Sequence, residues 1–177
     1  MSIPAWLPEN KTTTPGAWRN WLFDRGSLTC KLTELAQGRF SVQVLSEGYD
    51  NLHPDERQLM GMSAPEQGWC REVLLLGKGQ PWVYARSVIN PTALSDPALG
   101  LRQLGAQPLG YVLFNTPNMQ RSELQVCTYP HERLPATWQT ETLFARRSCF
   151  SLQHSHVLVT EVFLPAFCQS SGLQHSE

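Results

Sequence analysis

One stretch, from Trp69 to Pro91, limits the possible folds most strongly, and it runs WCREVLLLGKGQPWVYARSVINP. Two apolar segments rich in β-branched and aromatic residues flank the run Gly77-Lys78-Gly79-Gln80, which is typical of a tight hairpin turn. We therefore predict two antiparallel strands that follow each other directly. A hairpin this apolar needs further strands or helices to cover it.

Four more segments have the composition of strands, namely 39–50, 119–130, 142–153 and 156–165, and the last two meet at a polar turn around His154-Ser155. Segment 15–38 looks helical in two pieces, with Gly26 between them, Ser27 as the cap of the second piece and Gly38 at its end. Short helices are expected in 90–115, and 50–66 is a loop or a short helix. This order predicts an α+β fold with about six antiparallel strands.

Three charged residues stand out because they interrupt apolar strands: Arg71, Arg86 and Glu161. A strand-end arginine whose head reaches solvent is an ordinary explanation for Arg71. An internal ion pair with Arg71, Arg146 or Arg147 is the ordinary explanation for Glu161. The alternative is a closed apolar pocket, in which one arginine holds a carboxylate and one glutamate handles a proton. Both explanations stay open at this point.

Length and composition point to one globular domain. The chain has 177 residues, of which 41% are hydrophobic and 16% charged, and its net charge is −1. No apolar run reaches the roughly 20 residues of a spanning helix, and the start of the chain does not resemble a signal peptide. We therefore expect a cytoplasmic protein with no membrane insertion and, in the absence of a basic run, no nucleic-acid partner.

The cysteines and histidines give no sign of a metal site. Five cysteines occur without a CxxC pair, and the five histidines form no HxxxH or HExxH pattern. We expect no metal and no cofactor. We also expect a loosely ordered N-terminal segment at 1–16, a folded domain at 17–166, and a flexible polar tail at 167–177.

Several blocks together resemble a known family. The blocks WCREVLLL, GQPWVYARSVINP, QPLGYVLF and ARRSCFSLQHSHVLVTEVFLP are similar, in order and spacing, to blocks of the bacterial chorismate pyruvate-lyases. With a weaker match near Ser27, the resemblance runs from about Trp21 to Pro165. It implies a cofactor-free monomer with a six-stranded antiparallel sheet, whose helical flaps close over an internal site. The implied reaction converts chorismate to 4-hydroxybenzoate and pyruvate, at the start of ubiquinone synthesis.

The resemblance also assigns residues. The family arginine that binds the ring carboxylate matches Arg71, and the family glutamate at the other end of the ligand matches Glu161. A backbone contact matches Leu109. In the family a methionine of the flap contacts the ligand, and Leu28 stands at the matching position here. A main-chain contact would tolerate this change, whereas a side-chain contact would alter the affinity for the ligand. The arginine that can follow the PLG motif in the family is Tyr111 here.

The chemistry leaves two routes open. Glu161 could act as a general acid that assists departure of enolpyruvate, and burial would favour the protonated form that this role requires. Alternatively, the ring hydrogen passes directly to the enolpyruvyl methylene while Glu161 holds the ring hydroxyl. The second carboxylate of chorismate also needs a cation, for which Arg86, Arg146 and Arg147 are the candidates. A pocket that encloses the product should release it slowly.

A different class of function is the main alternative. The same α+β sheet serves the ligand-sensing domains of transcription regulators, and a non-catalytic sensor of small acids would also keep an arginine for its ligand. The short segment ahead of Trp18 leaves no room for a helix-turn-helix. A purely structural protein does not explain Arg71 and Glu161 together.

Overall fold

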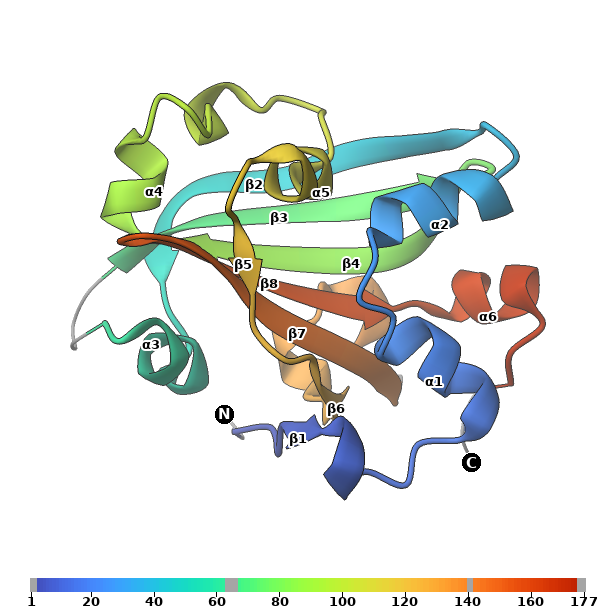
Figure 1. The fold of residues 1–177 in the computed structure, drawn as a ribbon. Coiled ribbons are helices and arrows are strands. Elements are labelled where there is room, and N and C mark those ends of the chain that lie inside the picture. The colour runs from blue at the N-terminus through green and yellow to red at the C-terminus, as the bar shows by residue number, and fades with distance from the viewer. Residues whose placement is uncertain (1–2, 63–66, 140–141, 175–177) are drawn as a thin grey trace.

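The computed structural model describes residues 3–62, 67–139 and 142–174. These residues form an antiparallel sheet in the order β1-β6-β7-β8-β4-β3-β2, with β5 pairing β7 beside β6 (Figure 1). The strands are β1 (Leu7–Pro8), β2 (Phe40–Asn51), β3 (Gln67–Gly77), β4 (Gln80–Ile89), β5 (Gln120–Arg121), β6 (Gln125–Tyr129), β7 (Leu143–Leu152) and β8 (Ser155–Phe163).

Helices lie between and after the strands. The α-helices are α1 (Gly16–Leu22), α2 (Leu28–Leu35), α3 (Pro54–Met60), α4 (Pro91–Ser95), α5 (Leu109–Asn115) and α6 (Pro165–Ser171). Short 3₁₀ helices are η1 (Glu9–Lys11), η2 (Leu101–Gln103), η3 (His131–Arg133) and η4 (Ala136–Trp138).

The predicted α+β class is confirmed, and so are the six longer strand segments. The segment 119–130 splits into β5 and β6, with a break at 122–124. The strand β1 was not predicted, and β5 was predicted only as part of the longer segment, because two residues show no alternation of apolar and polar positions. The alternative of a short helix within 50–66 is the correct one, since α3 occupies Pro54–Met60.

The β3–β4 hairpin turns as the sequence predicts. Only Lys78 and Gly79 lie between the strands, with φ angles of 54° and 78°. Two successive positive φ angles are the mark of a type I′ turn, which matches the twist of the flanking strands. At the end of the hairpin, a Cβ on Gly77 would lie 2.1 Å from the ring of Trp82, so only glycine allows this tryptophan to pack there.

Helices α1 and α2 are joined at the predicted break. The side chain of Ser27 caps α2 by accepting a hydrogen bond from the backbone N–H of Cys30 at 3.4 Å. Buried residues of both helices, among them Trp18, Leu28 and Leu32, pack in one cluster with the sheet and with α6. The two helices are thereby held over one face of the sheet (Figure 1).

The two faces of the sheet differ in what covers them. Arg71, Ala85, Glu161 and Arg146 lie on one face, as their register pairs and shared pocket show, and we call it the pocket face. Helices α2 and α5 lie over it. Because side chains alternate along a strand, Arg86 lies on the opposite face, which α3 covers and which we call the α3 face.

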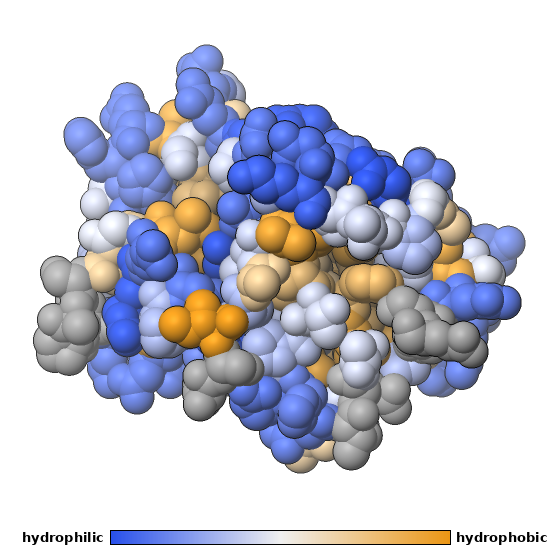
Figure 2. All heavy atoms as spheres, turned by 90° about the horizontal axis from the view of Figure 1, so that it is seen from below, coloured by the Kyte–Doolittle hydropathy of each residue, from blue (hydrophilic) through white to orange (hydrophobic). Residues whose placement is uncertain are grey.

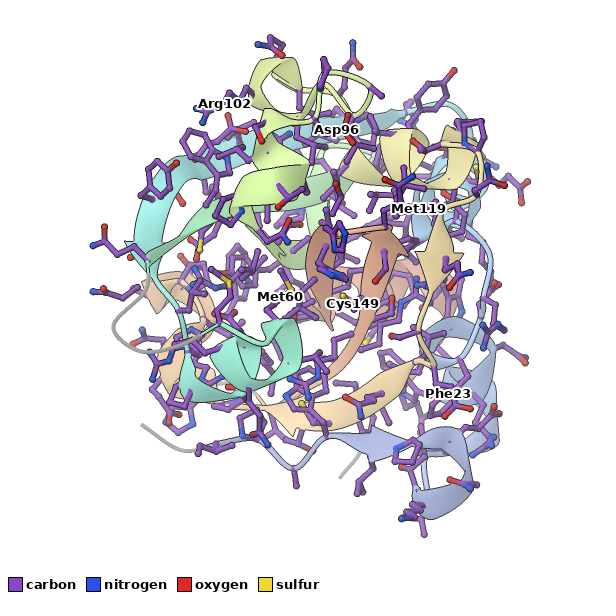
Figure 3. All side chains as sticks on the ribbon, turned by 60° about the vertical axis from the view of Figure 1, so that its left-hand side comes forward. Phe23, Met60, Asp96, Arg102, Met119 and Cys149 are labelled. Carbon is purple, nitrogen blue, oxygen red and sulfur yellow. The ribbon has the colours of Figure 1, made fainter. Side chains whose placement is uncertain are left out.

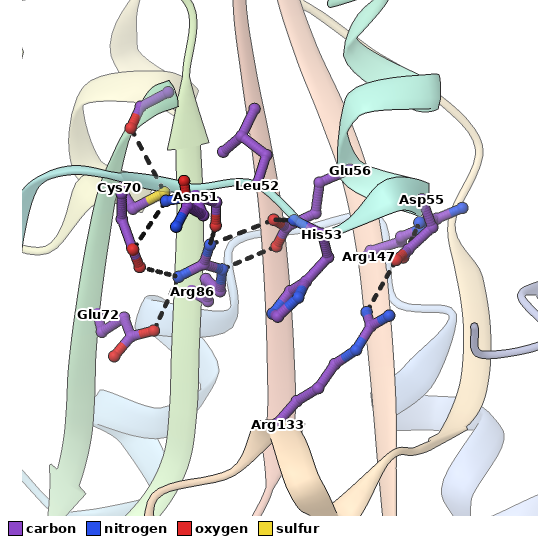
Figure 4. Close-up of polar contacts among 12 residues, drawn as sticks. Asn51, Leu52, His53, Asp55, Glu56, Cys70, Glu72, Arg86, Arg133 and Arg147 are labelled. Atoms are coloured by element: carbon purple, nitrogen blue, oxygen red, sulfur yellow. Dashed lines mark hydrogen bonds and ion pairs between the residues drawn. The ribbon is translucent and has the colours of Figure 1, made fainter. Parts of the chain in front are cut away.

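On the α3 face, apolar packing is combined with buried charge. Met60 of α3 packs in a cluster that includes Cys149 of β7, and Figure 3 shows both side chains between α3 and the sheet. Beside them, Arg86 is bonded to Glu56 at 2.8 Å and to Glu72 at 2.9 Å (Figure 4). These contacts attach α3 to strands β3 and β4.

The chain ends are better packed than the sequence indicates. The expected flexible tail begins at 167, yet Phe167 is fully buried in α6 against Trp21 and Phe163. A helix of only seven residues is too short to stand out in a polar sequence. In the expected loose segment 1–16, Trp6 donates a 3.0 Å hydrogen bond to Asp55, and β1 pairs with β6. Residues 1–2 and 175–177 lie outside the described residues.

The surface in Figure 2 is a mosaic of hydrophilic and hydrophobic residues, without one broad apolar face in that view. Large apolar side chains that are exposed come from separate elements, including Leu7 of β1, Tyr49 of β2 and Tyr111 of α5. Within the described part of the chain, no helix is long and apolar enough to cross a membrane.

Candidate active site

A pocket lies between the pocket face of the sheet and the helices α2 and α5. It contains about 590 Å³ of space between atoms, including the part that opens to solvent. Its lining is mainly apolar, with four charged side chains. The lining residues are Leu28, Thr29, Val42, Arg71, Val73, Leu75, Ala85, Ser87, Pro108, Leu109, Gly110, Leu113, Phe114, Arg121, Arg146, Phe150, Val159 and Glu161.

The four residues assigned through the family resemblance all line this pocket: Arg71, Glu161, Leu109 and Leu28. Arg71 pairs with Ser87 of β4, and Glu161 of β8 pairs with Ala85 on the other side of that strand. Neighbouring strands are about 4.8 Å apart, and the partners of the two residues are two positions apart along β4, so the backbones at Arg71 and Glu161 are roughly 12 Å apart. An arginine and a glutamate therefore face one apolar pocket from different sides.

Arg71 is buried, with a side chain only 2% exposed, so the interpretation of a strand-end arginine that reaches solvent is wrong. Its Nη1 lies 3.1 Å from Oε1 of Glu47, and its Nη2 donates to the carbonyl oxygens of Gly105 at 2.7 Å and Gln107 at 3.2 Å. Either edge of a guanidinium that grips a carboxylate with two hydrogen bonds includes an Nη2 hydrogen. A carboxylate ligand bound in this way would replace one of the two carbonyl contacts.

Glu161 is held in an ion pair, which was one of the explanations left open by the sequence. Its Oε2 lies 2.6 Å from Nε of Arg146, and the glutamate side chain is 13% exposed. The same arginine donates through Nη1 to the carbonyl oxygens of Trp21 at 2.7 Å and Asp24 at 3.1 Å. Arg146 thereby connects the sheet to the end of α1 and compensates the charge of Glu161.

Arg121 was missed by the sequence analysis. Its Nε donates to Oγ of Ser148 at 2.9 Å, and its Nη1 to the carbonyl oxygens of Arg25 and Gly26 at 2.9 and 3.4 Å. Burial lowers the pKa of Arg121 to about 10, and the nearby charge of Arg146 acts in the same direction. The polar segment around Arg121 has no periodicity that marks this arginine, and only the pairing of β5 with β7 brings it to the pocket.

Two candidates for the second carboxylate lie on the wrong face of the sheet. Arg86 is bound to Glu56 and Glu72, and Arg147 lies 3.0 Å from Asp55, both on the α3 face (Figure 4). Neither lines the pocket. Alternation along β7 explains the difference between Arg147 and its neighbour Arg146, because successive side chains point to opposite faces.

The two helices over the pocket, α2 and α5, which we call the flaps, meet at a glycine. A Cβ added at Gly110, the second residue of α5, would lie 3.2 Å from Oγ1 of Thr29 in α2. The absence of a side chain lets the two helices approach closely over the pocket, next to Leu109 and Leu28.

The described residues contain no group of three or more His, Cys, Asp or Glu side chains placed to hold a metal ion.

A family model described as chorismate lyase matches residues 2–171, which is nearly the whole chain. The chain belongs to the chorismate lyase family. The elements that form the pocket, from α2 to β8, all fall within the matched region.

Named relatives agree with this assignment. A probable chorismate pyruvate-lyase of Pseudomonas putida is 46% identical over 169 residues, which cover 94% of this chain and 91% of that protein. Another, from Pseudomonas aeruginosa strain UCBPP-PA14, is 45% identical over 154 residues, which cover 87% of this chain and 86% of that protein.

Solved structures with the same fold include a domain of a repressor. The C-terminal domain of a histidine utilization repressor from Pseudomonas syringae has a TM-score of 0.53 at 8% identity, over 78% of this chain and 96% of that one. PhnF from Mycobacterium smegmatis has a TM-score of 0.55 at 11% identity, over 81% of this chain and 65% of that one. At these identities the likeness concerns the fold alone.

Proposed function

We propose that this protein is a chorismate pyruvate-lyase, a carbon–oxygen lyase that splits chorismate into 4-hydroxybenzoate and pyruvate in the pocket between the sheet and the helices α2 and α5. The observation that carries the proposal is the placement of Arg71 and Glu161 at different sides of one mainly apolar pocket. Chorismate carries a carboxylate and a hydroxyl at opposite positions of its ring, so it can contact both residues at once.

In this proposal Arg71 binds the ring carboxylate. The arginine is buried, and charge-assisted hydrogen bonds are strong where water is excluded. Its contacts to the carbonyls of Gly105 and Gln107 connect the carboxylate site to the segment that leads into α5. Binding of the ring carboxylate is thus coupled to the position of the α5 flap.

Glu161 binds the ring hydroxyl as a carboxylate. Its ion pair with Arg146 supports this role, because an ionised carboxylate only accepts hydrogen bonds. The C–O bond of the ether breaks, the neighbouring ring hydrogen moves to the enolpyruvyl methylene, and the ring becomes aromatic. The hydrogen and the electron pairs are all supplied by the substrate, so the protein orients and stabilises the reacting conformer.

The flaps exclude water and retain the product. Leu28 of α2 and Leu109 of α5 line the pocket on the side opposite the sheet. In this proposal their main chains or side chains contact the ring. Since 4-hydroxybenzoate keeps the ring carboxylate and the hydroxyl, it keeps the contacts to Arg71 and Glu161. Product release is therefore expected to limit turnover.

The test is to mix the purified protein with chorismate and follow the ultraviolet spectrum, while pyruvate is measured separately. We expect 4-hydroxybenzoate and pyruvate in equal amounts, with or without exhaustive chelation. A protein that binds chorismate and leaves it unchanged would instead be a sensor of small acids. Loss of activity with chelator, restored by one metal ion, would contradict the cofactor-free mechanism.

A further inference from the structure

The pocket carries more positive than negative charge. Its charged lining consists of three arginines and one glutamate, a formal sum of +2. Two of the arginines, Arg121 and Arg146, are close enough for the charge of one to lower the pKa of the other. Burying like charges together is costly unless an anion compensates them. At this end of the pocket Glu161 supplies one negative charge for the two arginines. Asp24, the other negative group near Arg121, lies outside the pocket lining and is paired with Lys31 at 2.6 Å.

Arg146 has an unused donor in this region. Its side chain is 1% exposed. Its Nε contacts the carboxylate of Glu161, and its Nη1 donates to the carbonyl oxygens of Trp21 and Asp24. The Nη2 atom is buried and has no hydrogen-bond partner among the described residues. Buried polar groups are nearly always paired, so an unpaired guanidinium nitrogen in a pocket lining points to a ligand oxygen.

Among the described residues, the hydrogen bonds that Arg121 donates go only to uncharged groups. It donates to one hydroxyl and two backbone carbonyls, and its guanidinium stacks over the rings of Phe114 and Phe150 at 5.4 and 5.0 Å. These contacts fix its position without neutralising it. A cation held in this way at a pocket wall is prepared for an anionic ligand.

The geometry of the substrate brings a second carboxylate to this place. In chorismate the ether-bearing carbon is next to the carbon that bears the hydroxyl. If the hydroxyl contacts Glu161, as in the proposed function, the enolpyruvyl group lies beside that residue. Arg146 forms an ion pair with Glu161, and Arg121 is close to Arg146. Both arginines are therefore at the end of the pocket that the enolpyruvyl group would occupy.

We propose that Arg121 and the Nη2 atom of Arg146 form the binding site for the enolpyruvyl carboxylate of the substrate. This inference rests on the proposed function and adds the residues that distinguish substrate from product. The site is used by chorismate, which has two carboxylates, and not by 4-hydroxybenzoate, which has only the ring carboxylate. After the C–O bond breaks, the same carboxylate belongs to pyruvate, and its departure leaves the arginines exposed to the pocket.

The experiment compares Arg121→Gln with the wild type for two ligands. Chorismate is followed by single-turnover kinetics over a range of protein concentrations, and 4-hydroxybenzoate by equilibrium titration. Losing one buried charge-assisted contact should weaken chorismate binding by about 10- to 150-fold. Titration with 4-hydroxybenzoate should give nearly the wild-type affinity, which also shows that the variant is folded. Arg121→Lys, which keeps the charge, should recover part of the loss.

Arg25→Gln is the matched control, because it removes an exposed positive charge near the site from a side chain that does not line the pocket. It should leave both affinities unchanged. Equal losses for both ligands in Arg121→Gln would mean that Arg121 only supports the loop at 25–26, and unchanged chorismate binding would exclude it from the site. Either result overturns the inference. Failure of the proposed function would differ, since the wild type itself would then not convert chorismate.

Discussion

Nε of Arg146 lies 2.6 Å from Oε2 of Glu161, and the two residues are direct register partners on the neighbouring strands β7 and β8. Register partners in an antiparallel sheet have side chains on the same face and in contact. The pair therefore fixes the position of the Glu161 carboxyl group at the pocket wall, while another nitrogen of the same arginine has no partner among the described residues. A glutamate that interrupts an apolar strand is thus explained by the strand beside it.

Replacing Glu161 by glutamine tests whether this residue supplies a proton or holds a hydroxyl. Glutamine still accepts a hydrogen bond, so we expect a single-turnover rate within about 10-fold of the wild type. A general acid that loses its proton should instead cost roughly 10²–10⁴-fold. Single-turnover kinetics are needed because slow product release masks the chemical step in steady state. A loss in the larger range would show that Glu161 is the acid.

Replacing Arg71 by alanine should weaken binding of both chorismate and 4-hydroxybenzoate. Both ligands keep the ring carboxylate, and a buried charge-assisted contact is worth on the order of 2–4 kcal/mol. Calorimetric titration with 4-hydroxybenzoate measures the effect without turnover. Lys78→Ala, in the β3–β4 turn, is a control that removes an exposed charge. Unchanged 4-hydroxybenzoate affinity in a folded Arg71→Ala protein would remove Arg71 from the site.

Replacing Gly110 by alanine should loosen the closed flaps. The added Cβ would lie 3.2 Å from Oγ1 of Thr29, closer than an ordinary contact, so the Thr29 side chain or α2 itself must shift by a few tenths of an ångström. We expect 4-hydroxybenzoate to dissociate several-fold faster, measured by stopped-flow displacement. Gly16→Ala is the matched control, because nothing lies within 4 Å of its added Cβ. If product dissociation is equally fast in both variants and the wild type, the contact at Gly110 does not hold the product.

Replacing Asp55 by asparagine should reduce stability in a pH-dependent way. Burial alone would raise the pKa of Asp55, but hydrogen bonds from Arg133 and Trp6 and the charges of Arg133 and Arg147 outweigh it and lower the pKa below the usual value. A lowered folded-state pKa stabilises the fold above the unfolded-state pKa of about 3.9, and this stability is lost as the pH falls through the folded-state pKa.

Denaturant unfolding at several pH values measures this effect. The wild type should be more stable than Asp55→Asn at pH 7, and the difference should shrink steadily below about pH 4. Glu34→Gln, at an exposed position in α2, controls for the loss of a carboxylate as such. A difference that stays constant from pH 7 to pH 3 would mean that the charge of Asp55 does not stabilise the fold.

The strands and their hairpins follow from the sequence because their signals are local. The turn at Lys78-Gly79 and the alternation in β3, β4 and β8 each depend on residues close together in the chain. The same alternation places Arg71 and Glu161 on definite sides of their own strands. Together with the family resemblance, that is enough to predict both as site residues.

The sequence alone therefore determined which residues share a face of one strand. The tertiary structure decided which of these faces and segments meet. Arg146 and Arg147 are equivalent in the sequence, and only the pairing of β7 with β8 assigns the first to the pocket and the second to α3. Arg121 reaches the same pocket through two residues of β5. Register between distant strands is set by the packing of whole faces, which no short stretch of sequence contains.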